Sequence, residues 1–221
     1  MKALVFKRYG SPDVLTFEDI PQPEPGDGQV LIKVQACALN YADWRLLTGD
    51  PFFARLAFGF PNPKIHTPGA DVAGQIVATG KNVTRFKAGD EVFGDLEISG
   101  CGGLAEYVLA DEPLLALKPA GISFEQTAAL PMAAVTALQA LRQGGIQAGQ
   151  KVLINGASGG VGSFAVQIAK DLECEVTAVC SSRHIELMHS LGADHIIDYT
   201  REDFTRTPQR YDLILAANGH H

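Results

Sequence analysis

The pattern of apolar and polar positions changes near residue 123. In the first part of the chain, short apolar stretches follow one another between Gly and Pro turns. Within residues 30–36, the apolar residues Val30, Ile32, Val34 and Ala36 alternate with the polar residues Lys33 and Gln35. Alternation with a period of two is typical of a half-buried strand. Further strands are predicted at residues 2–7, 71–79, 89–93, 103–110 and 114–118. Many short strands separated by turns predict a compact, barrel-like β domain over residues 1–122.

Two segments interrupt this β pattern. Asn40 can cap a short helix that runs to Leu47 and ends at Gly49. Residues 50–68 contain prolines and four phenylalanines with little periodicity, which predicts an irregular loop near a pocket. The aromatic residues either wall an apolar pocket or form a small separate core, and both interpretations stay open. They are Phe52, Phe53, Phe58 and Phe60.

From residue 123 onward the sequence favours helices and then a regular alternation. Ser123 and Gln126 have the spacing of a capping box, and Pro131 can open a second helix that ends at Gly144 and Gly145. Strands are then predicted at 151–155, 174–180, 195–198 and 211–216, with helices at 160–171 and 183–191. This alternation predicts an α/β domain with a parallel, doubly wound sheet over residues 123–221.

A glycine-rich turn joins the first of these strands to the first helix. The turn has the spacing Ala157-x-Gly159-x-x-Gly162, which is the dinucleotide fingerprint with its first glycine replaced by alanine. Glycines let backbone N–H groups approach a pyrophosphate, and a helix N-terminus favours negative charge. We therefore expect the turn to bind a dinucleotide; the alternative is that its glycines serve only tight packing. The expected contact residues are Ala157, Ser158, Gly159, Gly160 and Val161.

The residues after the second strand of this domain bear on which dinucleotide binds. A site for NAD usually places an acidic residue there, to bond the ribose 2′-hydroxyl. The sequence instead has Ser181, Ser182 and Arg183, with no carboxylate to repel a 2′-phosphate. Two hydroxyls and a guanidinium can bind that phosphate, and Tyr199 can close over it, so we expect NADPH. The alternative makes Arg183 a solvated residue and Tyr199 a core residue.

Composition and charge exclude several classes of protein. The net charge of −7 argues against a nucleic-acid binder. No apolar run is long enough to span a membrane, and the first residues are not typical of a signal peptide. The four cysteines form no C-x-x-C pair, so we expect neither a disulfide framework nor a zinc site, and a cytoplasmic location.

The predicted strand at 211–216 is the fourth of this sheet, whereas a complete dinucleotide fold has six. We therefore expect this domain to be incomplete in the 221 residues. The hypothesis that follows is that a longer protein is the enzyme and that this chain alone is weak or inactive.

Several short motifs, in order, resemble a known family. Each motif is weakly specific, but together they extend over nearly the whole chain. They are Asn40–Asp43, Pro68–Gly74, Gly89–Gly94, Gly103–Val108, Asn155–Gly162 and Leu191–Tyr199. The chain resembles the zinc-independent quinone oxidoreductase branch of the medium-chain dehydrogenase/reductase superfamily. The resemblance implies a GroES-like domain, a Rossmann domain, an active site in the cleft between them, and a homodimer.

The resemblance also bears on zinc. Zinc-dependent relatives carry a Cys at or near position 40 and Gly-His-Glu where this chain has Gly69, Ala70 and Asp71. Alanine cannot ligate a metal, and between Gly89 and Leu114 the chain has one cysteine where the structural zinc of those relatives needs four. The resemblance therefore implies an enzyme without a metal site.

The expected chemistry without zinc is hydride transfer from NADPH to an electrophilic acceptor, a quinone or an α,β-unsaturated carbonyl. By the resemblance, Asn40 and Tyr41 line the cleft as hydrogen-bond donors, and Thr136 lies near the nicotinamide. The alternative for Tyr41 is a core aromatic residue. Two other functions stay open: an enoyl-thioester reductase, and a non-catalytic NADPH-binding or structural protein.

Overall fold

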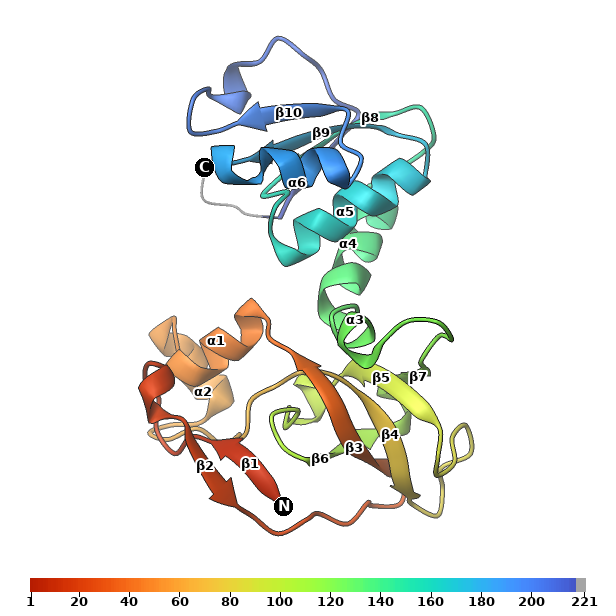
Figure 1. Ribbon diagram of the computed structural model, residues 1–221. Coiled ribbons are helices and arrows are strands. Elements are labelled where there is room, and N and C mark those ends of the chain that lie inside the picture. The colour runs from red at the N-terminus through yellow and green to blue at the C-terminus, as the bar shows by residue number, and fades with distance from the viewer. Residues whose placement is uncertain (218–221) are drawn as a thin grey trace. The chain divides into compact units, whose positions relative to one another are not determined.

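The computed structural model describes residues 1–217 and divides into two compact units, residues 1–132 and residues 133–221 (Figure 1). The sequence placed a domain boundary at residues 122/123, where the helical segment begins, and that division stays a prediction. We describe each unit by itself.

Unit 1 is built on an antiparallel sheet with strand order β6-β3-β4-β5-β7, and a separate hairpin pairs β1 with β2. The predicted strands are confirmed in position, and β4 has the predicted bounds. Thr16–Asp19 was missed, because its mostly exposed side chains show no apolar alternation. The strands are β1 (Lys2–Val5), β2 (Thr16–Asp19), β3 (Gln29–Ala38), β4 (Asp71–Thr79), β5 (Glu91–Asp95), β6 (Tyr107–Asp111) and β7 (Leu115–Leu117).

The main core of unit 1 lies on one face of this sheet. Alternate residues of β3 and β4, including Val30, Ile32, Val72 and Ile76, are fully buried there. A second, smaller core contains buried residues from separate segments, and the partly buried Phe58 packs against it. Its buried members are Phe6, Leu46, Leu47, Ala70 and Cys101.

The helices of unit 1 are short. The predicted helix after Asn40 is confirmed as α1 (Tyr41–Thr48), and Gly49 ends it with a φ of 62°. The irregular loop predicted for residues 50–68 is wrong in part, because it contains η2 (Phe52–Ala54) and α2 (Arg55–Phe58). These helices are too short to show a period in the sequence. The capping box at Ser123 is confirmed and opens α3 (Phe124–Ala128). The remaining 3₁₀ turns are η1 (Pro12–Val14), η3 (Glu97–Ser99) and η4 (Glu112–Leu114).

Unit 2 contains the predicted parallel sheet. Across residues 133–217 the strand order is β10-β9-β8-β11, and every pairing is parallel. Helix α4 (Pro131–Gln143) leads into it, and α4, α5 and α6 contribute to a single core on one face of the sheet (Figure 1). The other elements are β8 (Lys151–Asn155), α5 (Gly160–Asp171), β9 (Glu175–Cys180), η5 (Ser182–His184), α6 (Ile185–Ser190), β10 (His195–Asp198), η6 (Phe204–Arg206) and β11 (Leu213–Ala216).

None of the helices in residues 1–217 is long and apolar enough to cross a bilayer. The chain is thus a mixed α/β protein with an antiparallel unit followed by a parallel one, as the sequence predicted.

Candidate cofactor and active sites

The carboxyl ends of the parallel strands in unit 2 lie at one edge of the sheet. Asn155 is paired with Val179 on one side and with Ala216 on the other, and Cys180 is paired with Asp198. In open α/β sheets, ligands bind outside this edge. The loops that follow the strands therefore form the candidate cofactor site.

The glycine turn after β8 packs tightly against the start of α5. Gly156 has a φ of 77°, which favours glycine. A Cβ added at Gly162 would lie 2.2 Å from the carbonyl oxygen of Gly156 and 2.7 Å from the Cα of Ala157. Gly162 therefore allows the helix to approach the turn closely, as the third glycine of the fingerprint does.

Some of the predicted contact residues in this turn already have partners. Ala157 is fully buried, its N–H donates to the carbonyl of Val179, and the N–H of Gly159 donates to the carbonyl of Gly156. The first N–H groups of an α-helix have no acceptor within the helix. Gly160 and Val161 occupy the first two positions of α5, so their N–H groups are the best placed to bind an anion. Ser158 is half-buried in the same turn.

The hydroxyls of the loop after β9 contact groups that the sequence did not indicate. No acidic residue follows β9 directly, but Ser182 Oγ donates to Asp198, which ends the neighbouring strand β10. Ser181 Oγ lies 3.2 Å from His184 Nδ1. Both hydroxyls expected to bind a phosphate therefore have partners within the protein.

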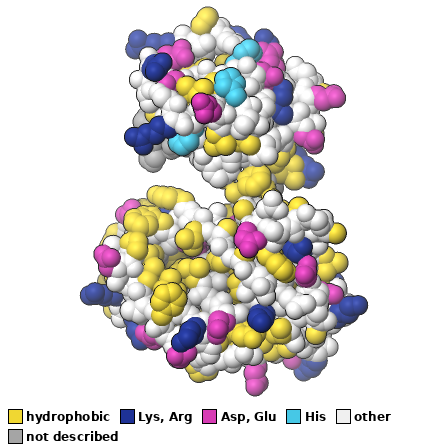
Figure 2. Space-filling model, viewed as in Figure 1, with side chains coloured by type: hydrophobic (Ala, Val, Ile, Leu, Met, Phe, Trp, Pro, Cys, Tyr) yellow, Lys and Arg dark blue, Asp and Glu magenta, His cyan; other side chains and the backbone are white. Residues whose placement is uncertain are grey.

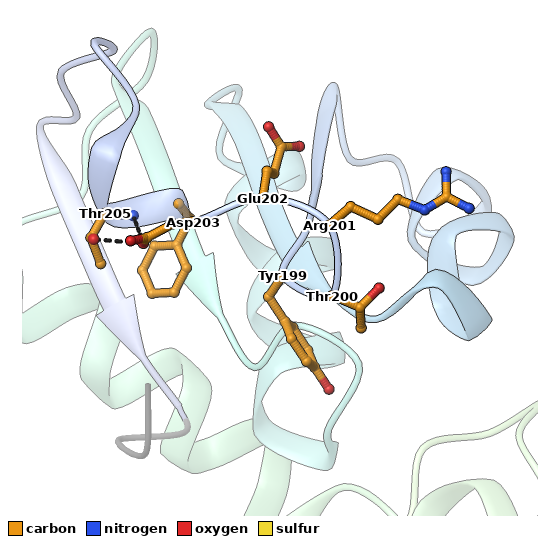
Figure 3. A pocket seen from close by; sticks show the side chains of 7 residues that line it. Tyr199, Thr200, Arg201, Glu202, Asp203 and Thr205 are labelled. Carbon is orange, nitrogen blue, oxygen red and sulfur yellow. Dashed lines mark hydrogen bonds between the residues drawn. The ribbon is translucent and has the colours of Figure 1, made fainter.

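Arg183 is open to a ligand, and the side chain of Tyr199 is partly accessible. Arg183 is exposed and has no hydrogen-bond or ion-pair partner among residues 1–217. Tyr199 follows Asp198 and is half-exposed, and its N–H donates to the carbonyl of Cys180. The Tyr199 ring is therefore not a core residue. It lines an open pocket of about 440 Å³ formed by residues 199–205, where it points away from Glu202 (Figure 3).

In unit 1, Asn40 is held by a buried carboxylate that the sequence analysis did not single out. Asn40 Nδ2 donates to Asp71 Oδ2 at 3.0 Å, and the Met132 N–H donates to both oxygens of Asp71 at 3.1 and 3.0 Å. Asp71 is completely buried, and burial raises its pKa to about 6. The hydrogen bonds from Met132 and Asn40 oppose that rise, whereas Asp95 and Asp43 add to it.

A second buried carboxylate fixes the backbone around Asn40. Asp43 Oδ2 accepts from the Asn40 N–H at 2.8 Å, and its Oδ1 accepts from the N–H groups of Gly69 and Ala70 at 2.8 and 3.2 Å. Three backbone donors satisfy this carboxylate, which makes it structural. It locks the start of α1 against the segment before β4.

The other residues of the predicted active site lie on the surfaces of their units. Tyr41 is 74% exposed in the first turn of α1, so it is not a core aromatic residue. Thr136 is exposed on α4. Asn40 and Tyr41 are neighbours in unit 1, whereas Thr136 belongs to unit 2.

The four phenylalanines of residues 50–68 differ in burial, and the pocket-wall role stays a prediction. Phe58 packs against the smaller core of unit 1, whereas Phe52, Phe53 and Phe60 are exposed. The ring centroids of Phe52 and Phe60 lie 6.2 Å apart in an edge-to-face arrangement. Figure 2 shows apolar side chains gathered on the visible face of unit 1 over α1 and α2.

The cysteines of unit 1 are not activated as nucleophiles. Burial raises the pKa of Cys37 and of Cys101 to about 12, and the nearby carboxylate of Asp43 adds to both shifts. A thiol reacts as its thiolate. We therefore expect iodoacetamide at pH 8 to leave both thiols unmodified in the native protein, and to modify them once urea unfolds it. Peptide mass spectrometry would measure this, and rapid labelling of the native protein would contradict the expectation.

Within the described residues, no group of three or more His, Cys, Asp or Glu side chains is arranged to hold a metal ion. Ala70 is buried and offers only a methyl group at the position where zinc-dependent relatives carry a histidine.

Two family models match the chain. Residues 26–120 match the alcohol dehydrogenase GroES-like domain, and residues 160–220 match the zinc-binding dehydrogenase model. They fall in unit 1 and unit 2 respectively. The GroES-like and Rossmann assignments made from the sequence are confirmed.

Three curated proteins illustrate the similarity. An NADPH-dependent alkenal/one oxidoreductase from Arabidopsis thaliana is 42% identical over 99% of this chain and 58% of its own length. A chloroplast envelope quinone oxidoreductase homolog from the same plant is 40% identical over 99% of this chain and 69% of its length. A trans-enoyl reductase from Aspergillus terreus is 39% identical over 86% of this chain and 55% of its own length. The chain spans less than two thirds of the first and third of these proteins.

Solved structures agree with these relatives. The quinone oxidoreductase from Coxiella burnetii superposes with a TM-score of 0.88 and 36% identity, covering 97% of this chain and 67% of that one. The Escherichia coli quinone oxidoreductase complexed with NADPH gives a TM-score of 0.81 and 26% identity, over 92% and 60%. The extent and level of this identity establish that the chain belongs to the medium-chain dehydrogenase/reductase superfamily, in its quinone oxidoreductase branch.

Proposed function

We propose that the protein is an NADPH-dependent oxidoreductase that transfers hydride to quinones or α,β-unsaturated carbonyls without zinc. One observation carries the proposal. At the carboxyl edge of the unit 2 sheet, a glycine turn that opens a helix lies beside a loop that presents Arg183, which has no partner within residues 1–217.

The residues at this edge fit a dinucleotide with a 2′-phosphate. The first N–H groups of α5 would bind the pyrophosphate, because the close packing at Gly162 lets the backbone approach it. Arg183 would bind the 2′-phosphate, since a guanidinium forms strong, charge-assisted bonds with phosphate oxygens. Tyr199 would cover the same end of the cofactor. NADPH in the names of a relative and of a structural neighbour supports this choice.

NADPH, when bound, supplies the hydride, and the chain provides binding and polarisation of the acceptor. Asn40 commits one amide N–H to Asp71, which fixes the amide and leaves its second N–H for an acceptor oxygen. The Tyr41 hydroxyl has no partner among residues 1–217 and offers a second donor. Such bonds stabilise negative charge that develops on the acceptor oxygen. Thr136 would lie near the nicotinamide, as the resemblance implies.

The absence of zinc chemistry is proposed from the side chains present. The methyl group of Ala70 cannot ligate a metal, and the Asn40 amide already bonds Asp71. We also propose a cytoplasmic location, as the four free cysteines suggest, although some relatives are named as chloroplastic.

A second candidate is an enoyl-thioester reductase. It is favoured by the relative named a trans-enoyl reductase and by the exposed hydroxyl of Tyr41, which such a reaction could use as a proton donor. Both candidates use the same cofactor site, so cofactor binding tests them together.

The test is a fluorescence titration of the chain with NADPH and with NADH, repeated with Arg183→Ala. We expect the wild-type chain to prefer NADPH. The substitution should weaken NADPH binding by about 10- to 100-fold, because it removes a charge-assisted bond to phosphate. NADH binding should not change.

Arg206→Ala is the matched control. Arg206 is also an exposed arginine of unit 2, but its Nε pairs with Asp203 at 3.1 Å. If it weakens NADPH binding as much as Arg183→Ala, the effect is one of general charge and the proposal fails. Failure of the wild-type chain to bind either dinucleotide would favour the non-catalytic alternative or a requirement for further residues.

A further inference from the structure

The carboxylate of Asp198 is the centre of a hydrogen-bond cluster beside the proposed phosphate site. Asp198 is the last residue of β10 and is 7% exposed. Its Oδ2 accepts from Ser182 Oγ, and its Oδ1 accepts from Thr200 Oγ1 at 2.7 Å and from the Thr200 N–H at 3.0 Å. The cluster links the loop after β9 to the loop after β10.

These bonds use the hydroxyl protons that a phosphate would need. A serine or threonine hydroxyl has one proton to donate, and a phosphate dianion offers only acceptors. Ser182 and Thr200 both donate to Asp198, although their oxygens lie only 3.0 Å apart. Neither hydroxyl can therefore bind a phosphate oxygen without leaving Asp198.

Asp198 is ionised at neutral pH, and its ion pair with Arg201 is long. The hydrogen bonds from Ser182 and then Thr200 lower its pKa, so the carboxylate stays ionised at neutral pH. Arg201 Nε approaches Oδ2 only to 3.5 Å, and its side chain is 78% exposed. The two hydroxyls thus provide the closest stabilisation of this anion, which favours their staying in place.

Two members of the cluster directly precede the two residues proposed to bind the phosphate. Arg183 is the residue after Ser182, and Tyr199 is the residue after Asp198. The backbone closes the second loop as well, because the N–H groups of Arg201 and Glu202 both donate to the Asp198 carbonyl at 3.0 Å.

We propose that Asp198 is a positioning residue for recognition of the ribose 2′-phosphate: through Ser182 it fixes the turn that presents Arg183, and Ser182 itself does not bind the phosphate. The inference rests on the proposed NADPH function. In this proposal, Arg183 and Tyr199 distinguish NADPH from NADH, and the carboxylate of Asp198 on the neighbouring strand keeps them in place.

A double-mutant cycle separates positioning from direct binding. Dissociation constants for NADPH and NADH would be measured by fluorescence titration for Ser182→Ala, Asp198→Asn and Arg183→Ala, and for the first two combined with Arg183→Ala. We expect Ser182→Ala to weaken NADPH binding by about 2- to 10-fold, the loss of one hydrogen bond, without changing NADH binding. In the Arg183→Ala background the same change should have no effect.

Asp198→Asn needs the cycle because it also removes a negative charge near the phosphate. That charge effect is the same in wild type and in the Arg183→Ala variant. The positioning effect is therefore the difference between the changes in NADPH affinity that Asp198→Asn causes in these two backgrounds. We expect Asp198→Asn to weaken NADPH binding more when Arg183 is present. Ser182→Thr, which keeps the hydroxyl, should restore wild-type binding.

Thr205→Val is the matched control, because Thr205 Oγ1 donates to Asp203 Oδ1 at 2.6 Å in the same loop (Figure 3). It should leave both affinities unchanged, and circular dichroism would verify that every variant folds.

Equal weakening by Ser182→Ala with and without Arg183 would show that Ser182 binds the phosphate directly. No weakening at all would show that the cluster does not position Arg183. Either result overturns the inference while wild-type NADPH preference keeps the proposed function standing; loss of that preference would remove both.

Discussion

Replacing Asp71 by Asn is expected to change the free energy of unfolding in a way that depends on pH. Relative to wild type, the variant should be more stable at pH 8 than at pH 4. Asp71 is fully buried, and its pKa of about 6 lies above the ordinary value of 3.8. The folded state therefore prefers the protonated carboxyl. The difference in free energy of unfolding between variant and wild type should shift toward the variant by about 2 kcal/mol across this interval.

The direction follows from proton linkage. Between pH 4 and pH 6 the folded protein binds more protons at Asp71 than the unfolded chain does, so the contribution of this group to stability falls as the pH rises. The contribution is fully present below the unfolded pKa and is lost once the pH passes the folded pKa. Asparagine does not titrate and removes this dependence.

Urea unfolding curves at several pH values would measure the effect, with Asp194→Asn as a control of opposite sign. Burial alone would raise the pKa of Asp194, but the hydrogen bonds from Lys170 and Val176 outweigh it and lower the pKa. Asp194→Asn should therefore lose stability relative to wild type as the pH rises through the acidic range up to and around 3.8, and should change little above it. Parallel behaviour of the two variants would contradict the assigned role of Asp71.

The ionised carboxylate of Asp71 is less favourable in the folded protein than its protonated form, but it also orients two hydrogen-bond donors. Asp71 holds the Asn40 amide and the N-terminal end of α4 at Met132. An asparagine at position 71 has one side-chain oxygen for these two donors, so the amide of Asn40 would lose its fixed orientation. The loss of the pH dependence and the loss of this orientation are two consequences of the same substitution.

The sequence predicted the fold best where burial and turn chemistry agree. The continuous apolar run of β8 and the glycines around it placed both the strand and α5 with their observed bounds. The helix predicted at 183–191 begins instead as the 3₁₀ turn η5 and becomes α-helical only at Ile185. The N–H of His184 donates to the carbonyl of Ser181 at 2.9 Å, which is the i→i+3 bond of a 3₁₀ turn.

The candidate site was predictable as far as it depends on local sequence. The glycine turn and Arg183 could be recognised from neighbouring residues alone. Asp198 and Asp71 could not, because their partners are distant in the sequence. Ser182 lies 16 residues from Asp198. Asn40 and Met132 lie 31 and 61 residues from Asp71. A signal did exist for Asp198: it is an acidic residue at the last position of a predicted strand, and consecutive parallel strands end side by side.

Replacing Gly162 by Ala is expected to lower the free energy of unfolding of unit 2 by about 3 kcal/mol. The added Cβ would lie 2.2 Å from the Gly156 carbonyl oxygen and 2.7 Å from the Ala157 Cα, and both atoms belong to the backbone. No side chain can move to relieve these contacts, so α5 must shift away from the turn.

Gly160→Ala is the matched substitution in the same helical turn. Its added Cβ would have the Ala133 Cβ at 3.6 Å as its nearest neighbour, an ordinary contact, and alanine favours the helix more than glycine does. We expect Gly160→Ala to keep or slightly raise stability, as measured by urea unfolding followed by circular dichroism. Equal destabilisation by the two variants would mean that the turn is sensitive to any side chain, and that the close approach at Gly162 is not what holds the helix against the strand.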